Sequence, residues 1–239
     1  MWRRVRAHAL TETRLLVRNG EQLLLALVIP VGILVLGRLL GGRFDDVQSL
    51  APSVLALAVW SSAFTSVAIA TGFERRYGVL ERLAPTPLGR TGVLAGKALS
   101  IVVVVLGQLV VVALVAGLAG WRPRWTFASG LLCVALVVLS VATFAALALT
   151  LAGRLRAETV LGLANVIYVL LLAGGALVLP LARYPQVIQP GIRLLPTAAL
   201  GEGLRAGTQG LLLGWPVAVL VVWLAVSAAA AGKVFRWTS

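Results

Sequence analysis

The sequence contains very few of the residues that build catalytic or metal sites. It has one histidine, His8, one cysteine, Cys133, and eight acidic residues among 239. One histidine in the N-terminal segment cannot assemble a histidine-dependent catalytic set or an intramembrane zinc site. One cysteine excludes a disulfide within the chain, and we interpret Cys133 as a small buried apolar residue. We therefore expect a chain that is not an enzyme and that binds no metal or cofactor itself.

Charged residues are also scarce, at 12% of the chain against 60% hydrophobic residues. Soluble domains contain about half apolar and a quarter charged residues. Backbone amides inside a bilayer must be satisfied within their own segment, which favours helices over other spanning structures, and a helical span needs roughly 20 apolar residues. We predict an all-α integral membrane protein, a single domain over 1–239 with six transmembrane helices at Leu23–Leu40, Leu50–Thr71, Ala98–Gly120, Phe127–Ala152, Thr159–Leu181 and Leu211–Ala231.

The net charge of +13 is explained by topology rather than by nucleic acid, because the basic residues flank the predicted spans. If the N-terminus is cytoplasmic, fourteen Lys and Arg residues lie on the inner side and seven on the outer side. Basic residues concentrate on the cytoplasmic side of membrane proteins. We therefore expect a multi-pass protein of the cell membrane with both termini in the cytoplasm and no nucleic-acid partner.

The chain carries no visible energy source. None of the predicted spans has Asp or Glu in its centre, where a proton-coupled transporter would hold a titratable relay. The stretch Thr91–Ala98 departs at both ends from the phosphate-binding pattern G-x-x-x-x-G-K-[ST]. If the chain transports a substrate, another subunit must supply the energy.

Three polar segments stand outside the spans. In residues 1–22 the pattern predicts an amphipathic helix on the inner membrane surface, with a solvated tail as the alternative. The basic residues of this segment are Arg3, Arg4, Arg6, Arg14 and Arg18. The cytoplasmic loop 73–92 predicts a short charged helix that ends before Pro85 and docks on a soluble partner, with a plain connector as the alternative.

The third segment, 183–210, lies on the outer side and is interrupted by Pro185, Pro190 and Pro196. Its remaining residues are too apolar for a free loop, and long loops without a role are uncommon in compact domains. We expect two short helices, around Gln186–Leu195 and Thr197–Ala206, that dip into the outer leaflet as a candidate outer gate.

Two of these segments resemble the ABC-2 type permease family. Phe73–Arg90 (FERRYGVLERLAPTPLGR) is similar to the family segment E-x-x-x-G-T-L-E-x-L-x-x-[TS]-P, with Val79 where threonine is commoner. Leu195–Arg205 (LPTAALGEGLR) is similar to the family's proline-to-arginine region before the last span. The six-span layout agrees along almost the whole chain.

The resemblance implies the permease subunit of an ATP-driven exporter that moves drugs, antibiotics or lipids, most similar to the drug- and antibiotic-resistance type. It implies a partner ATPase that binds ATP and Mg²⁺, and a second permease subunit in a homodimer or heterodimer. Residues 1–22 would be the interfacial elbow helix, and Pro185, Pro190, Pro196, Glu202 and Arg205 would belong to the extracellular re-entrant gate. The ATPase-coupling residues would be Glu74, Arg75, Arg76, Gly78, Glu81 and Arg82. A gradient-driven secondary transporter and a membrane assembly or scaffold protein remain alternatives.

Overall fold

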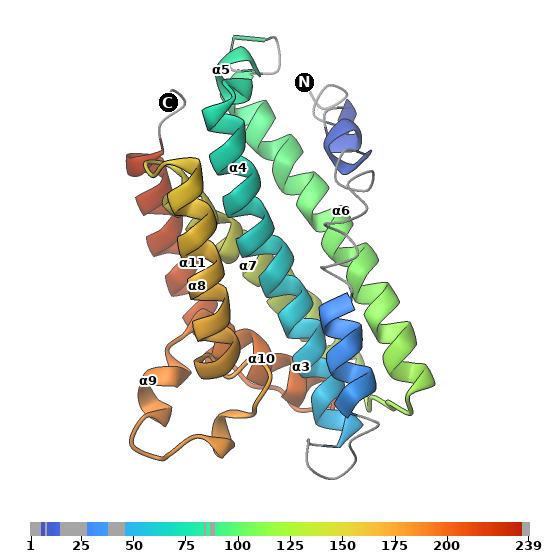
Figure 1. Ribbon diagram of the computed structural model, residues 1–239. Helices are drawn as coiled ribbons and strands as arrows, with labels where there is room; N and C mark the ends of the chain where they lie inside the picture. The colour runs from blue at the N-terminus through green and yellow to red at the C-terminus, as the bar shows by residue number, and fades with distance from the viewer. Residues whose placement is uncertain are drawn as a thin grey trace.

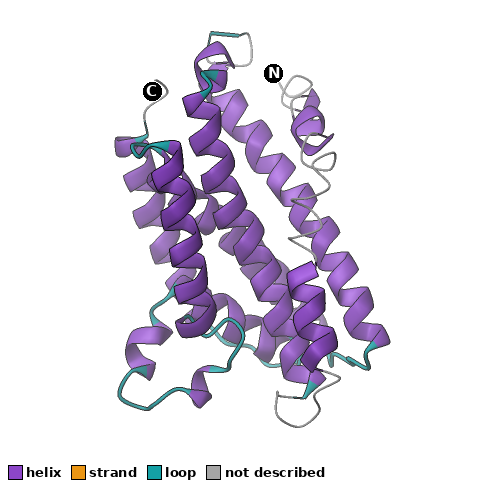
Figure 2. Cartoon of the chain, viewed as in Figure 1, coloured by secondary structure: helices purple, strands orange, loops and turns teal. Residues whose placement is uncertain are grey.

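A computed structural model describes residues 6–7, 9–14, 28–37, 46–83, 85–86 and 89–235. Within these residues all regular structure is helical, as the apolar blocks predict (Figures 1 and 2). Five helices are long and apolar enough to cross a membrane: Val47–Arg76, Ala95–Leu118, Phe127–Ala152, Ala157–Gly174 and Trp215–Val234. A shorter apolar helix, Val28–Gly37, lies inside the first predicted span, so a sixth crossing stays a prediction.

Of the predicted surface helix, the structure describes residues 6–7 and 9–14, which are helical. Arg6 and Arg14 are exposed there, and Ala9 is buried. Arg3, Arg4 and Arg18 lie outside the described residues. The position of this helix relative to a membrane surface stays a prediction.

One long helix runs through the middle of the bundle. It consists of α3 (Val47–Trp60), a π-helical segment η1 (Ser61–Ser66) and α4 (Val67–Arg76). Figure 1 shows α6 (Gly89–Leu118) on one side of it, and α8 (Ala157–Gly174) and α11 (Trp215–Val234) on the other, with α7 (Phe127–Ala152) behind. Every residue of α3 except Gln48 and Ser49 is buried, so this helix forms the core of the subunit.

Aromatic side chains fill the centre of this core. The Trp60 ring stacks on Phe64 with centroids 4.4 Å apart and meets the edge of Phe144 at 4.8 Å. Trp60 is only 1% exposed, which fits a packing residue. Beside the aromatic cluster, the Ser62 hydroxyl donates to the side-chain oxygen of Gln108 on α6 at 2.5 Å, and both residues are buried.

Helices α7 and α11 form a parallel pair with a repeated polar contact. The Thr143 hydroxyl donates to Leu139 O within its own helix and to Leu220 O of α11 at 3.3 Å. One heptad further, the Thr150 hydroxyl repeats the arrangement with Ser227 O at 3.3 Å. Hydroxyl groups that satisfy backbone carbonyls in this way join helices inside a membrane without exposing polar atoms to lipid.

The helix boundaries differ most from the apolar blocks at three places. Helix α4 continues past Thr71 to Arg76, and α6 begins at Gly89 rather than Ala98. Helix α8 ends at Gly174, short of the predicted Leu181. The early end follows from Gly174–Gly175 and from Ala176, whose φ of 52° lies in the left-handed region that interrupts a helix.

Candidate functional site

The helical bundle has two structurally distinct ends, named here by the short helices that occupy them. The α5 end carries α5 (Val79–Leu83), residues 6–7 and 9–14, and the last turn of α11 (Figure 1). The α10 end carries η2 (Leu181–Arg183), α9 (Gln189–Arg193) and α10 (Pro196–Gly207). The six predicted coupling residues lie at the first end and the five predicted gate residues at the second.

Helix α5 is joined to α4 by a tight turn at Tyr77 and Gly78. Gly78 has a φ of 67°, a conformation that glycine adopts without the penalty of a β-carbon. The sequence predicts one helix through Glu74 and Arg82, and this is wrong in detail. Residues 74–76 are the last turn of α4, and only Val79–Leu83 form the separate helix after Gly78.

Three of the predicted coupling residues fasten the base of this turn to the bundle. The Lys97 ammonium on α6 lies 2.5 Å from both carboxylate oxygens of Glu74. The Arg76 guanidinium forms an ion pair with Glu158 on α8. The Arg75 side chain is buried and donates to Ala152 O, at the end of α7, and to Leu155 O, in the turn that follows. These residues hold the turn in place rather than presenting a docking face.

Of the other three coupling residues, Gly78 forms the turn and Glu81 and Arg82 lie on α5. Glu81 and Arg82 are exposed, as are Tyr77 and Val79, whose exposed fractions are 63% and 38%. Leu80 alone of the helix is buried, at 3% exposure, and it anchors α5 against the bundle. Figure 1 shows α5 standing beyond the ends of α8 and α11. The exposed surface of α5, defined as Tyr77, Val79, Glu81 and Arg82, is therefore mixed apolar and charged.

At the other end, Arg205 of α10 is the centre of a buried polar cluster. It is only 6% exposed and its guanidinium makes four hydrogen bonds. The acceptors are Ser53 Oγ of α3 at 2.7 Å, Leu177 O at 3.0 Å, Ala176 O at 2.6 Å and Glu202 Oε1 at 2.8 Å. We call these five residues the Arg205 clamp. It joins α3, the segment after α8, and α10.

Glu202 extends the clamp to the loop beyond it, because its Oε1 also accepts a hydrogen bond from Leu181 N at 2.7 Å. Helix α10 packs among α3, α7 and α11, and ten of its twelve residues are buried. A β-carbon on Gly207 would lie 2.4 Å from Cys133 Sγ, and one on Gly203 would lie 2.6 Å from Leu136 Cδ1. The small residues of α10 thus permit its close approach to α7.

The predicted prolines mark the starts and turns of this region. Pro196 is buried at the first position of α10, and Pro190 occupies the first turn of α9, where proline is favoured. Pro185 is exposed, and its carbonyl accepts from Ile188 N at 3.0 Å. Helix α9 is held to α11, because the Trp223 indole donates to Leu194 O at 2.8 Å and the Arg193 guanidinium lies 4.8 Å from the Trp215 ring centre.

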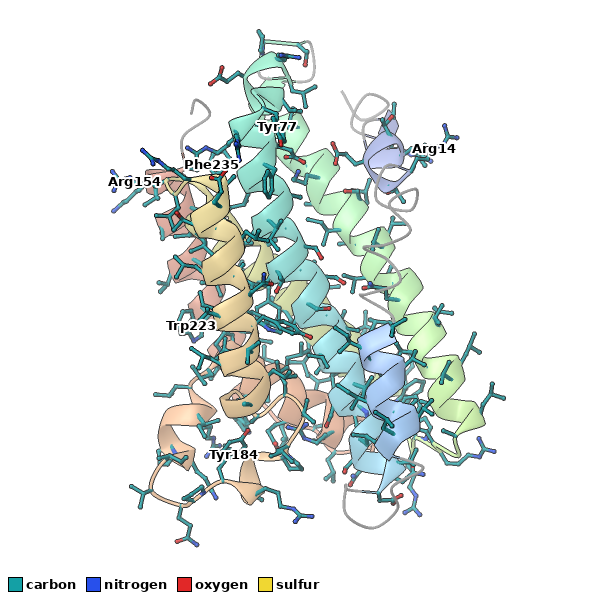
Figure 3. All side chains as sticks on the ribbon, in the orientation of Figure 1. Arg14, Tyr77, Arg154, Tyr184, Trp223 and Phe235 are labelled. Carbon is teal, nitrogen blue, oxygen red and sulfur yellow. The ribbon has the colours of Figure 1, made fainter. Side chains whose placement is uncertain are left out.

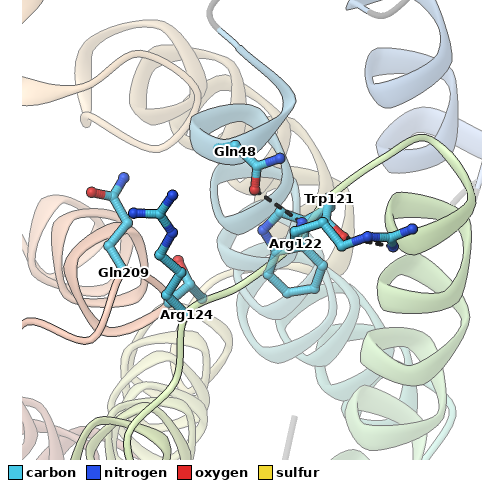
Figure 4. Close-up of a pocket in the computed structure, with 6 residues that line it drawn as sticks. Gln48, Trp121, Arg122, Arg124 and Gln209 are labelled. Atoms are coloured by element: carbon cyan, nitrogen blue, oxygen red, sulfur yellow. Dashed lines mark hydrogen bonds between the residues drawn. The ribbon is translucent and has the colours of Figure 1, made fainter.

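A cavity of about 370 Å³ lies at the α10 end between α3, the 120–126 loop and the end of α10 (Figure 4). Gln48 holds the loop, since its amide donates to Gly120 O and its oxygen accepts from Arg122 N, both at 3.0 Å. Arg124 N donates to Thr208 O at 2.7 Å. This loop and α10 therefore form one connected surface.

The sequence alone does not predict which residues contact the Arg205 guanidinium and the Glu74 carboxylate. Ser53 and Lys97 are single polar residues whose roles depend on contacts with residues distant in sequence. Glu202 and Arg205 are three residues apart on a short helix, and this spacing predicts that their side chains form an ion pair. No comparable local signal marks Ser53. Among the described residues, no group of His, Cys, Asp and Glu is placed to hold a metal ion.

Comparison with known families decides the class of the protein. Residues 3–208 match the ABC-2 type transporter family, which covers both the α5 turn and the Arg205 clamp. The chain belongs to the ABC-2 type transporter family. No protein of curated function matches it.

Membership of the ABC-2 family makes this chain a multi-pass membrane component of an ABC transporter. Such components work with an ATP-binding subunit, which accounts for the missing energy source in the sequence. Members of the family are membrane transport components. The ABC-2 chain thus has a short exposed helix at one end of its bundle and a buried polar clamp at the other.

Proposed function

We propose that this ABC-2 chain is the permease subunit of an ATP-binding cassette exporter, with its α5 end in the cytoplasm. Both described ends of the chain then face the cytoplasm, in agreement with the two-to-one excess of basic residues on that side. Two such subunits, identical or different, enclose the pathway of a drug, antibiotic or lipid. Among the described residues, the acidic side chains lie near the ends of the spans or in the segments between them, which suits a hydrophobic or amphipathic cargo.

The observation that carries this proposal is the exposed surface of α5. A five-residue helix on a glycine turn, anchored by Leu80 and braced by the Glu74–Lys97 ion pair, stands beyond the spans. A rigid helix of this kind can enter a groove on a soluble subunit and pass on its movement. We assign Glu81 and Arg82 to contact with the ATPase, and Glu74, Arg75, Arg76 and Gly78 to holding α5 in position.

The α10 end would then close the outer side of the pathway. The Arg205 clamp fixes α10 to the central helix, and the Trp223 and Arg193 contacts fix α9 to α11. In this arrangement α9 and α10 are the re-entrant helices of the outer gate. Pro185, Pro190 and Pro196 set where these helices begin and turn.

The coupling role is tested by reversing charge on α5 in the reconstituted complex with its ATPase. Glu81→Arg and Arg82→Glu are expected to abolish ATP-dependent transport while the chain still folds and inserts. The matched control is Lys233→Glu, an exposed basic residue at the same end but on α11. Substrate transport and ATPase activity are measured together in proteoliposomes.

Three outcomes would overturn the proposal. Transport that persists in both α5 variants at the level of the control would remove α5 from the coupling step. Transport by the purified chain without any ATPase would instead favour a gradient-driven transporter. A dimer that shows no transport and no pathway between subunits would favour a scaffold.

A further inference from the structure

A basic cavity lies beside the α5 turn and has no part in the proposed docking of α5. It measures about 370 Å³ and opens between the last turn of α4, the end of α7 and the start of α8. Four arginines line it, Arg75, Arg76, Arg154 and Arg156, against a single carboxylate, that of Glu158. We call it the arginine pocket. Its lining carries an excess of three positive charges, which favours an anionic occupant.

The four arginines have different tasks. Arg75 is buried and donates to Ala152 O at the end of α7 and to Leu155 O in the turn that follows, which fixes the α5 turn to this part of the bundle. Arg76 is paired with Glu158 at the rim, where both side chains are more than half exposed. Arg154 and Arg156 are exposed, and the described part of the chain places no carboxylate in an ion pair with either of them. Two guanidinium groups are therefore available to an anion.

The backbone adds to this positive potential. Helix α8 begins at Ala157, and no side chain caps its first turn. The amides of a first helical turn lack intrahelical acceptors, and the helix dipole places partial positive charge at this point. Ala157 and Glu158 both line the pocket. An anion held by Arg154 and Arg156 would therefore also lie near these amides.

The position of the pocket along the membrane-spanning helices indicates which class of anion it binds. It lies where α7 ends and α8 begins, at the boundary of two apolar spans, while α5 stands further out (Figure 1). Figure 3 shows Arg154 at this level, near the end of α11 at Phe235. Lipid phosphates occupy this boundary, and basic pockets between helices on the cytoplasmic side bind anionic head groups. A soluble protein would meet the exposed surface of α5 first.

We propose that the arginine pocket binds the phosphate of an anionic phospholipid from the leaflet at the α5 end. The lipid would join α4, which carries the α5 turn, to the α7–α8 turn. Its binding would stabilise the end of the subunit on which α5 stands. The proposal takes the α5 end as cytoplasmic, as the proposed function does, but it holds whether or not Glu81 and Arg82 contact an ATPase.

The test is a lipid titration of the purified full-length chain in neutral detergent, followed by native mass spectrometry. Phosphatidylglycerol is the probe, phosphatidylcholine of the same chain length is the neutral control, and inorganic phosphate is the soluble control. Each basic residue near a membrane surface contributes about a fivefold change in affinity for anionic lipid, so the double variant Arg154→Gln/Arg156→Gln is expected to weaken phosphatidylglycerol binding by about thirtyfold. Lys233→Gln, which removes a basic residue at the same end outside the pocket, is expected to bind as the unaltered chain does.

A second variant moves the affinity in the opposite direction, so a folding defect cannot imitate it. Glu158→Gln removes the only carboxylate of the lining and frees Arg76, and it is expected to bind phosphatidylglycerol several-fold more tightly. Equal binding by the double variant and the unaltered chain would overturn the proposal. So would displacement of the lipid by millimolar inorganic phosphate, which would indicate a soluble anion. A double variant that binds lipid normally but fails to assemble with an ATPase would assign the pocket to a protein contact.

Discussion

The Arg205 clamp makes the sharpest prediction about stability. Replacing Arg205 with alanine removes four hydrogen bonds at once, to Ser53, Ala176, Leu177 and Glu202. It also leaves the Glu202 carboxylate, whose side chain is 22% exposed, without its cation. Loss of one partner from a buried ion pair costs about 3–5 kcal/mol. Hydrogen bonds between membrane helices are individually weaker, at about 0.6 kcal/mol on average.

Because Glu202 keeps some exposure and its bond from Leu181 N, we expect the lower end of this range. Arg205→Ala should lower the free energy of unfolding by about 3 kcal/mol. For a chain of this size that corresponds to about 6–12 °C in Tm. Arg205→Lys keeps the charge but not the planar fork that reaches several acceptors, and it should show about half this loss. Thermal unfolding in detergent, followed by circular dichroism, measures both.

Arg193→Ala is the matched control. It removes an arginine from the same end of the bundle, but Arg193 is exposed and only lies over the Trp215 ring. Cation–π contacts at exposed sites contribute about 0.5–1 kcal/mol. A double-mutant cycle with Glu202→Gln isolates the pair from the three other acceptors. If Arg205→Ala and Arg193→Ala lowered Tm equally, the clamp would not be the main tie between α10 and the central helix.

Two other predictions concern contacts inside the bundle. Gly207→Ala places a β-carbon 2.4 Å from Cys133 Sγ, so it should destabilise the chain by about 1–3 kcal/mol, and adding Cys133→Ala should recover most of the loss in the same thermal assay. No recovery would mean that α10 does not pack on α7 through this glycine. Gln108→Leu and Ser62→Ala each remove one buried hydrogen bond and should lower stability by about 1 kcal/mol. Combining them should add little, and full additivity of the two losses would show that the pair does not interact.

The helices themselves could be predicted from sequence because a bilayer leaves the backbone few alternatives. Long apolar blocks gave the positions of five spans, and Pro196 marks the start of α10. The helix expected from Gln186 is shorter in the structure and begins at Gln189.

Hydropathy did not predict the C-terminal end of α4 or the N-terminal end of α6, because both helices extend into polar sequence. There, Glu74 is paired with Lys97, and Arg75 donates to Ala152 O at the end of α7 and to Leu155 O just beyond it. Such partners lie far away in sequence, so an apolar window cannot detect them.

The same limit applies to the candidate site. A charged motif indicated that residues 74–82 matter, but it did not separate those that brace the turn from those on the exposed surface of α5. Burial and contacts together make that distinction. Arg75 is 7% exposed and Arg76 is paired with Glu158, whereas Tyr77 is 63% exposed. Arg205 could be selected as the end of a family segment, but its contact with Ser53, 152 residues earlier, required the fold.

These contacts attach both ends of the subunit to one helix. Ser53 joins the Arg205 clamp near the start of the continuous helix Val47–Arg76, and Glu74 and Arg75 brace the α5 turn at its end. A movement of α5 along the helix axis would therefore reach the clamp unless the helix yields between them. The only non-α stretch in this helix is the π-helical segment Ser61–Ser66, and π-helical insertions concentrate where helices adapt for function. That segment is held by the stacked Trp60 and Phe64 rings and by the Ser62–Gln108 bond. The packing around the π segment therefore determines how rigidly the two ends are connected.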